Sequence, residues 1–407
     1  MMKNELSIRD RALLVLRGGI PQHLPFITRL ETWYTAHQRT RTIPEKFHGM
    51  TLDEVHRAVG VGRLKFSVPL KFRLVGVEVY ATFNGEELTP LAEPVVENFP
   101  GLWDLVPTDK AGTTHTELVT PVGRLSLTHV LLENGVFNGT DPYLKEHLVK
   151  SESDLQVVEY ILDRAEFVPD YSKIKAEEAQ IGDNGLLVPL LQRIPFQQVL
   201  LEYLGEMALF HALHDKRDLV RRLLDLLDRQ MLTALEQITN LDVPYVEFPD
   251  NLHGPMTNPK LFREYCLPAY QKYTDILHRQ GKKVGSHTDG DIRPLMELLV
   301  ESGLDVCESI SPYPLTSLTF QEINRAWRGK PLLWGVLPTP ILEEHTSESE
   351  FQTYLDDLLA AIDQPLILGL VDLFLRHNSI ERVETISCRV ESLDLPARIN
   401  ISKGMLL

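Results

Sequence analysis

Residues 281–307 read GKKVGSHTDGDIRPLMELLVESGLDVC, and ESISP follows them. A short apolar run ends at His287 and Asp289, an amphipathic segment follows, and a second apolar run ends at Cys307 and Glu308. The runs lack the polar alternation of a half-exposed strand, which indicates strands buried on both faces of a parallel sheet. The stretch is therefore typical of one strand–helix–strand unit.

The same order of buried run, polar turn and helical segment recurs from about residue 155 onward. Buried runs such as VPYVEFP (243–249), PLLWGVLP (331–338) and PLILGLV (365–371) alternate with segments whose apolar residues recur every three or four positions. Units repeated this often predict a (β/α)₈ TIM barrel or an open doubly wound sheet. No GxGxxG motif supports a dinucleotide-binding sheet, and unusual polar residues end several runs, so we favour the barrel.

The first 150 residues have a different pattern. A helical segment is followed by short alternating pieces at 70–85 and 114–130, which turn residues separate as in antiparallel hairpins. We expect residues 1–150 to form an N-terminal helical and β-hairpin elaboration over the barrel mouth, and residues 151–407 to form the barrel core. No low-complexity linker separates them, so residues 1–407 are predicted to be a single domain.

The composition excludes several classes of protein. Of 407 residues, 43% are hydrophobic and 24% are charged, which is usual for a soluble globular chain. No run approaches the roughly 20 apolar residues that span a bilayer, and the N-terminus lacks a signal-peptide core, so we expect a cytoplasmic protein. The net charge of −16 disfavours nucleic-acid binding, and three scattered cysteines disfavour a disulfide framework. The oligomeric state stays open, with a homodimer as one option.

Candidate metal ligands gather at the strand ends of the opening stretch. Residues two apart in a strand face the same way, so Gly285, His287 and Asp289 share one face. Cys307 and Glu308 are neighbours, so only one of them is expected to point inward. Histidine with two acids, or with an acid and a thiol, could form a three-ligand Zn²⁺ site. Alternatively, these residues cap a helix and bond loop amides, with Cys307 a small buried residue.

Other candidates lie at further strand ends and near the N-terminus. Asn251 and His253 could bind substrate or form an Asx turn and a surface loop, and Asp250 and Asp372 are further acids expected at the barrel mouth. Arg29 could bind a carboxylate, and Trp33 and Tyr34 could stack on an aromatic ring or simply pack on the barrel.

The segment at 258–312, NPKLFREYCLPAYQKYTDILHRQGKKVGSHTDGDIRPLMELLVESGLDVCESISP, resembles the uroporphyrinogen decarboxylase superfamily, as does LLWGVLPTPIL at 332–342. The segment LPFITRLETWYTAHQRTRTIPEKFHGMTLDEVHRAVGVG at 24–62 looks like the corrinoid-linked methyltransferase branch. The arginine-rich MRQAGR-type loop of the decarboxylases is absent. The resemblance implies a (β/α)₈ barrel whose active site lies at the carboxyl ends of its strands.

The methyltransferases of this superfamily use Zn²⁺ and exchange a methyl group with the cobalt of a separate corrinoid protein. Their thiol-methylating members carry His-x-Cys-Gly where this chain has His287, Thr288, Asp289 and Gly290. The resemblance implies His287, Asp289 and Glu308 as ligands, with Cys307 as second choice. A histidine with two acids leaves a more Lewis-acidic ion, which suits polarising an oxygen.

The expected function is therefore a zinc-dependent O-demethylase type of methyltransferase. It would move a methyl group from a methoxylated, aromatic small molecule to the Co(I) of a corrinoid protein. Trp33, Tyr34, Tyr203 and Phe248 are expected to wall the aromatic pocket. Two alternatives stay open: a metal-independent decarboxylase in which Arg29 holds a carboxylate, and a catalytically degenerate ligand-binding protein.

Overall fold

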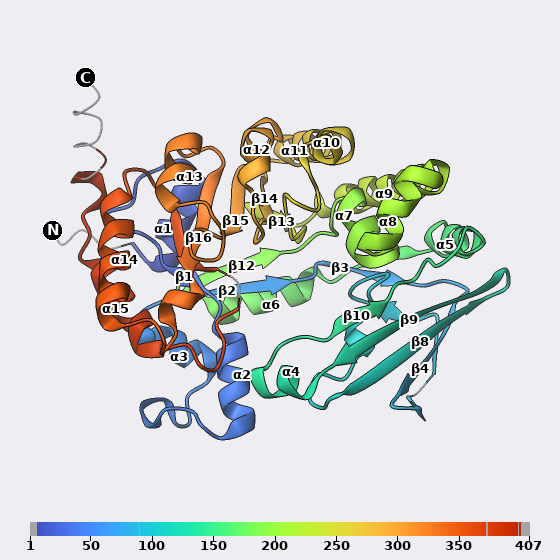
Figure 1. Ribbon diagram of the computed structural model, residues 1–407, viewed down its shortest axis with the longest axis horizontal. Coiled ribbons are helices and arrows are strands. Elements are labelled where there is room, and N and C mark those ends of the chain that lie inside the picture. The colour runs from blue at the N-terminus through green and yellow to red at the C-terminus, as the bar shows by residue number, and fades with distance from the viewer. Residues whose placement is uncertain (1–5, 89, 372, 398, 400–407) are drawn as a thin grey trace.

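The computed structural model describes residues 6–88, 90–371, 373–397 and 399 (Figure 1). Eight parallel strands form two sheets, and antiparallel sheets lie to one side of them. The structure therefore confirms a mixed α/β protein with parallel strands. Within the described residues, no helix combines the length and the apolar character needed to cross a membrane.

The parallel strands form a three-stranded and a five-stranded sheet. The first has the order β1 (Ile27–Thr28), β2 (Gly62–Ser67) and β12 (Gly185–Pro189). The second has the order β13 (Tyr245–Phe248), β14 (Lys283–His287), β15 (Val306–Ile310), β16 (Leu332–Pro338) and β17 (Ile367–Val371). Isolated parallel bridges connect the two sheets on both sides, Leu190 to Glu247 and Phe26 to Leu368.

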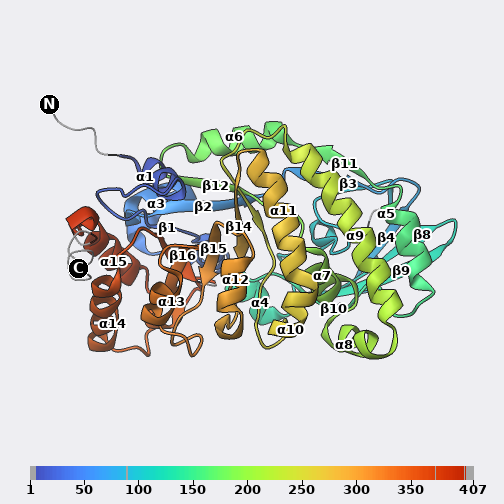
Figure 2. The same ribbon diagram turned by 90° about the horizontal axis from the view of Figure 1, so that it is seen from above.

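Helices separate successive parallel strands along the chain and lie outside β13–β17 (Figure 2). They are α5 (Asp154–Leu162), α6 (Tyr171–Ile181), α7 (Pro195–Gln198), α8 (Glu206–Asp215), α9 (Arg217–Ile238), α10 (Pro259–Leu261), α11 (Leu267–Arg279), α12 (Met296–Glu301), α13 (Phe320–Trp327), α14 (Glu348–Ala361) and α15 (Ile380–Glu391). The N-terminal part adds α1 (Ile8–Leu16), α2 (Glu31–Thr40), α3 (Leu52–Val59) and α4 (Glu133–Asn138). Single π-helical turns follow α7, at Val199–Tyr203, and α10, at Phe262–Cys266.

Local sequence explains where these helices begin and which face they bury. Thr319 and Ser347 start α13 and α14 with capping boxes, each accepting from the amide of a glutamate three residues later. In α9 the buried residues include Leu219, Leu223 and Leu226, which recur at the three- and four-residue spacing of one helical face. That face packs inward, and the charged residues of α9 stay in solvent.

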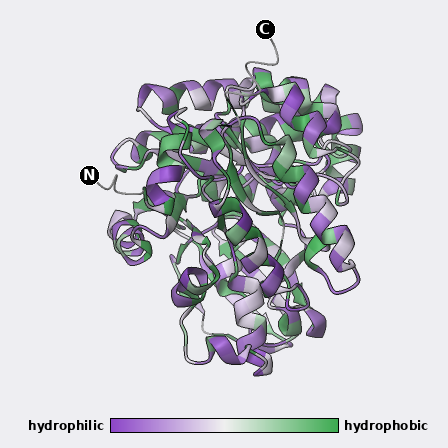
Figure 3. Cartoon of the chain, turned by 90° about the vertical axis from the view of Figure 1, so that its left-hand side faces the viewer, coloured by the Kyte–Doolittle hydropathy of each residue, from purple (hydrophilic) through white to green (hydrophobic). Residues whose placement is uncertain are grey.

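The hydrophobic core has two parts. They are separate because successive residues of a strand point to opposite faces of the sheet. One part includes Tyr245, Val306 and Trp334 of the parallel strands, together with Val15 of α1. The other, larger part lies between the strands and the helices and includes Phe248. Figure 3 shows the hydrophobic residues concentrated in the interior strands and the hydrophilic ones on the outer helices. Alternate residues of each buried strand therefore face different cores, which decides which side chains reach the site.

The predicted hairpins of the N-terminal part are present. One antiparallel sheet has the order β10 (Tyr143–Glu146), β9 (Gly123–Leu131), β8 (Gly112–Thr120), β4 (Glu78–Phe83) and β5 (Glu86–Glu87), with β6 (Leu91–Ala92) also on β4. Another has the order β11 (Glu166–Pro169), β3 (Leu70–Arg73) and β7 (Val95–Val96). Strands β1 and β2 nevertheless pair in parallel with β12. Part of residues 1–150 thus belongs to the parallel strands and not to the elaboration.

Candidate metal centre

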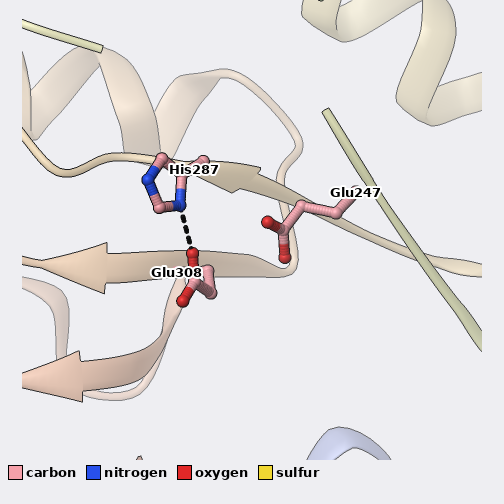
Figure 4. Close-up of side chains that lie close together, drawn as sticks. All are labelled: Glu247, His287 and Glu308. Atoms are coloured by element: carbon pink, nitrogen blue, oxygen red, sulfur yellow. Dashed lines mark hydrogen bonds and ion pairs between the residues drawn. The ribbon is translucent and has the colours of Figure 1, made fainter. Parts of the chain in front are cut away.

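Three ionisable side chains meet at the carboxyl ends of neighbouring strands (Figure 4). Glu247 comes from β13, His287 ends β14, and Glu308 lies in β15. In the parallel register His287 is directly opposite Glu308, and Glu247 is opposite the glycine two residues before His287. All three side chains therefore stand on the same face of the sheet, at one edge.

One ligand atom from each of the three residues lies within 4.8 Å of the other two. His287 Nδ1 is hydrogen-bonded to Glu308 Oε2 (Figure 4). The hydroxyl of Tyr245 donates to Glu247 Oε2 at 2.7 Å, whereas Glu247 Oε1 is buried and has no hydrogen-bond partner. Asp289 lies on the other side of the imidazole, with its Oδ2 at 3.4 Å from His287 Nε2.

Gly285 makes room for this arrangement. A Cβ atom at this position would lie 1.9 Å from the Tyr245 hydroxyl, closer than any van der Waals contact allows. The absent side chain lets the tyrosine reach across β14 beneath Glu247. The glycine in the opening sequence run is therefore a packing requirement of the site.

The charges of these groups depend on one another. Burial, and next the charge of Glu308, raise the pKa of Glu247 to about 8. Burial alone would lower the pKa of His287, but the charge of Glu308 and the hydrogen bonds of Asp289 and Glu308 raise it to about 10. Burial opposes ionisation of Asp289 too, yet the hydrogen bond and charge of His287 lower its pKa to about 2. The site thus attracts positive charge, which the imidazolium supplies when no cation is bound.

The donor set fits a divalent cation. An imidazole nitrogen and two carboxylates are a ligand set that zinc uses in proteins, with room for a further ligand. The unpartnered Glu247 Oε1 supports this reading, because a buried oxygen without a hydrogen bond is costly unless something else satisfies it. Glu247, His287 and Glu308 are therefore the residues that could hold such an ion.

Strand parity distinguishes between the two sequence candidates on β15. Glu308 is on the face of the cluster, whereas Cys307 belongs to the core between strands and helices. Burial raises the pKa of the Cys307 thiol, which keeps it neutral. Cys307 is thus an inert buried thiol, and Glu308 is the side chain that reaches His287.

The structure brings Asn251 to the cluster but gives Asp250 another role. Asn251 Nδ2 donates to Asp289 Oδ2 at 2.9 Å. Asp250 is fully buried and accepts hydrogen bonds from the Ile194 amide at 2.8 Å and from the Tyr270 hydroxyl at 2.6 Å. Its carboxylate therefore joins the end of β13 to the start of α7 and to α11. Asp372, also expected at the strand ends, lies outside the described residues.

Most residues expected to contact substrate are used for packing. Trp33 is 1% exposed, and its ring packs against Phe374 with centroids 6.1 Å apart. Tyr203 and Phe248 are fully buried, because their positions face the core between strands and helices. The aromatic wall predicted from the sequence is therefore not formed by these three rings.

Two further candidates are held by backbone groups. The Tyr34 hydroxyl donates to the Met50 carbonyl at 2.7 Å. His253 Nδ1 accepts from the amide of Asp291 at 3.1 Å. Both side chains therefore have structural partners, and the bond to His253 engages only one of its two ring nitrogens.

Arg29 opens onto a cavity of about 480 Å³. The cavity is also lined by Lys65, Phe66 and Phe374, and Arg29 lies over the ring of Phe66 at 5.1 Å. Burial and Glu308 raise the pKa of Glu247, and the positive charge of Arg29 partly opposes that rise. The cavity can therefore receive an anionic group beside Arg29 and Lys65.

Glu247 was missed by the sequence analysis, although its signal was present. It is an acid inside the apolar run VPYVEFP, where a charged residue is costly unless it has a function or a partner. The predicted candidates were instead the polar residues after the run, Asp250, Asn251 and His253. An isolated acid within a buried strand is the pattern that would have found it.

Comparison with known proteins supports the resemblance over part of the chain. The family model "Uroporphyrinogen decarboxylase (URO-D)" matches residues 203–363, a segment that contains all three members of the cluster. None of the curated proteins searched matches the chain.

Among solved structures, a methyltransferase from Methanosarcina mazei aligns over 95% of this chain and 99% of its own, with a TM-score of 0.54 and 12% identity. The tandem GH20 catalytic modules of the pneumococcal exo-β-D-N-acetylglucosaminidase StrH align over 91% of this chain and 84% of theirs, with a TM-score of 0.32 and 9% identity. The first likeness supports the fold, and the second is too weak to bear on it.

Proposed function

We propose that the protein is a metal-dependent methyltransferase in which Glu247, His287 and Glu308 hold a zinc ion. The observation that carries this proposal is the convergence of three donor groups from adjacent strand ends, one with an unpartnered oxygen. The printed name of the Methanosarcina mazei structure, a methyltransferase, and the match to the decarboxylase family model favour an enzyme of this general kind.

The proposed substrate is a methoxylated aromatic compound, and the proposed acceptor is the Co(I) of a corrinoid protein. A bound zinc ion supplies Lewis acidity toward the ether oxygen. The chain supplies oxygen and nitrogen donors and directs Cys307 away from them, and thiolate ligands would weaken that acidity. The carbon–oxygen bond breaks as the methyl group passes to cobalt, and the oxygen leaves as an alkoxide or phenolate that takes up a proton.

Arg29 has a proposed role in orienting the substrate. Arg29 lines a cavity and its guanidinium can pair with an acidic substituent on the substrate ring. In a closed barrel, Arg29 would hold the substrate at the same end of the strands as the cluster.

We also infer that the eight parallel strands close into a (β/α)₈ barrel. The two isolated bridges, Leu190 to Glu247 and Phe26 to Leu368, join the edges of the three- and five-stranded sheets in parallel orientation. Closure supports the proposed site, because it brings Arg29 after β1 and the cluster on β13–β15 to the same end of the strands.

Metal analysis of the purified full chain tests the proposal. We expect about one equivalent of zinc per chain, and loss of it in Glu247→Gln, His287→Ala and Glu308→Gln, because three protein ligands is the usual minimum for such a site. Cys307→Ala is the matched control, since it changes the neighbouring residue on the opposite face. Zinc that persists in all three variants, or an unaltered chain that binds no cation, would overturn the proposal.

Activity is then measured as methylcobalamin formation from methoxylated aromatic compounds and reduced cobalamin. We expect a zinc-dependent rise in the methylcobalamin absorbance that His287→Ala abolishes and Cys307→Ala retains. No methyl transfer from any methoxylated donor by zinc-loaded protein would count against the substrate class.

Metal-independent decarboxylation is the second candidate. Without a cation, the raised pKa values of His287 and Glu247 leave both groups protonated at neutral pH, ready to donate a proton to a carbanion. Arg29 would hold the substrate carboxylate. Release of CO₂ that chelators do not affect would support this function over methyl transfer.

A further inference from the structure

A line of polar contacts leads from Arg193 to the imidazole of the cluster. Arg193 Nη1 donates to Asn251 Oδ1 at 2.6 Å, and Asn251 Nδ2 donates to Asp289 Oδ2 at 2.9 Å. The same Asp289 oxygen lies 3.4 Å from His287 Nε2. A single amide side chain therefore joins a guanidinium on one side to the carboxylate beside the imidazole on the other.

The direction of the Asn251 amide follows from its partners. A guanidinium only donates hydrogen bonds, so the Asn251 oxygen must face Arg193 and its NH₂ group must face Asp289. Arg193 is itself fixed, because its Nε lies 3.1 Å from Glu202 Oε1 and its carbonyl accepts from Gln198 at 2.7 Å. The amide is thus held in one orientation.

The backbone of Asn251 is equally specific. Its φ angle of 50° lies in the left-handed region, where asparagine, aspartate and glycine are tolerated better than other residues. The sequence therefore places at this turn a residue type that can adopt the backbone conformation and also bridge two charges.

The two nitrogens of His287 have separate surroundings. Nδ1 faces Glu308 within the three-residue cluster, whereas Nε2 faces Asp289, which lies outside the group of mutually close ligand atoms. Histidine ligands of metal ions commonly donate their other ring N–H to a carboxylate, which fixes the ring orientation and the tautomer. The position of Asp289 matches that supporting role better than the role of a ligand.

We propose that Asn251, held by Arg193, is a positioning residue that keeps Asp289 against Nε2 of His287, so that Nδ1 is the nitrogen presented to the cation. This inference rests on the proposed function, and it assigns Asp289 to orienting the imidazole and not to binding the ion. Asn251 acts on the site through Asp289 and touches neither the ion nor the substrate.

An exchange of the two side chains tests the proposal. Asn251→Asp removes the donor to Asp289 and places two carboxylates together, so we expect zinc affinity to fall about 10- to 100-fold, as for other residues that support metal ligands. Asp289→Asn opposes the amide donor of Asn251 with a second amide and should also weaken binding.

The double variant Asn251→Asp/Asp289→Asn exchanges the two roles. The new carboxylate at position 251 accepts from Arg193 and from the new amide at position 289. The oxygen of that amide accepts from His287 Nε2 after the side chain turns, because one oxygen of Asp289 faces both partners in the unaltered chain. We expect the double variant to bind zinc more tightly than either single variant, giving a measurable coupling in the double-mutant cycle. If Asp289 were a direct ligand, the exchange would not restore binding, and that result would overturn the proposal.

Zinc affinity is measured on the full chain by competition with a chromophoric chelator, and cobalt(II) absorption spectra report the ligand geometry. Asn258→Asp is the matched control, because it makes the same change at the cap of α10, where aspartate caps equally well. An unchanged affinity and spectrum in Asn251→Asp, or a crystal structure with zinc on Nε2 of His287, would contradict the assignment.

Failure of the proposed function is distinguishable from failure of this inference. If the unaltered chain binds no cation, the proposed function is overturned, and crystal structures of the cation-free chain decide the positioning role. An imidazole of His287 that keeps the same orientation in Asn251→Asp and in the unaltered chain would then overturn the inference.

Discussion

Two buried carboxylates at the end of β13, only three residues apart, have opposite surroundings. Asp250 accepts hydrogen bonds from the Ile194 amide and from the hydroxyls of Tyr270 and Ser286. Glu247 accepts one hydrogen bond, from Tyr245, and its second oxygen has no partner. Both side chains are fully buried, so the difference lies in how far their oxygens are satisfied.

This difference separates a structural acid from a candidate ligand. A buried carboxylate whose oxygens are satisfied holds neighbouring elements together and has no capacity for an external ion. A buried carboxylate with an unpartnered oxygen beside a histidine and another acid costs stability and gains it back on binding a cation. Burial alone does not distinguish the two, and their hydrogen bonds do.

The largest effect is expected at the structural acid. Asp250→Ala removes the acceptor of a buried backbone amide and leaves the Tyr270 and Ser286 hydroxyls with only their contact with each other, so we expect a loss of about 3–5 kcal/mol in the free energy of unfolding. Urea denaturation of the cation-free chain measures it. Zinc stoichiometry of the folded fraction should stay unchanged, and a selective loss of zinc without a loss of stability would reverse the assignment of the two acids.

Next in size is the effect of the cation itself. Zinc at 100 times its dissociation constant is expected to stabilise the folded chain by about 2.7 kcal/mol, because it binds the folded state alone. Thermal unfolding with and without a chelator measures the gain. His287→Ala should show no gain and Cys307→Ala the full one, whereas equal gains in both variants would place the ion elsewhere.

Glu247→Gln should stabilise the chain when no cation is present. The pKa of Glu247, about 8 in the folded chain, lies above its ordinary value of 4.5, so folding is penalised increasingly as the pH rises between these values. The glutamine carries no such penalty, so we expect a gain of about 1–3 kcal/mol at pH 7 that is absent below pH 4. Denaturation at both pH values checks this, and a destabilised variant at pH 7 would contradict it.

Two buried histidines repeat the contrast between the regions. The neighbouring Glu308 contributes to raising the pKa of His287, whereas burial, and next the charge of Arg63, lower that of His56 to about 3. Between pH 6.5 and 3, the unfolded chain therefore takes up a proton on His56 and the folded chain does not. The contribution of neutral His56 to the free energy of unfolding is complete above pH 6.5 and is lost as the pH falls toward 3.

The last effect is a slope, up to about 1.4 kcal/mol in the free energy of unfolding per pH unit between pH 6.5 and 3. His56→Gln should reduce the acid slope of the unfolding free energy by up to that amount. His214→Gln, which changes an exposed histidine, is the control and should leave the slope as it is. Equal slopes for His56→Gln and the unaltered chain would show that His56 is not buried as a neutral ring.

The repeated alternation of strands and helices and the hairpins could be predicted from the sequence, because both depend on local periodicity. The approach of His287 to Glu308 was also within reach, since parallel strands align their carboxyl ends. The choice between Cys307 and Glu308 was not, because it depends on which face of β15 turns toward the cluster. The alternation of side chains along a strand requires Cys307 and Glu308 to point to opposite faces, but it does not determine which of them points inward.

The aromatic residues show a different limit. Trp33 and Phe248 lie near strand ends in sequence and Tyr203 lies in the helical segment after β12, but a large ring gains more from the core than from a cavity open to water. Which core a ring enters depends on packing between elements far apart along the chain. The aromatic substrate that the resemblance implies therefore did not predict the environment of these rings.

The sequence by itself determined the strand–helix units from about residue 155 onward, the hairpins before them and the presence of His287 and Glu308 on adjacent strands, since periodicity and strand direction are local properties. Only the tertiary structure decided that Glu247 completes the group and that Asp289 stands behind the imidazole. Those roles depend on distances between side chains of different strands, and such distances follow from sheet register, from the space that Gly285 leaves, and from the hydrogen bonds that each buried oxygen finds or lacks.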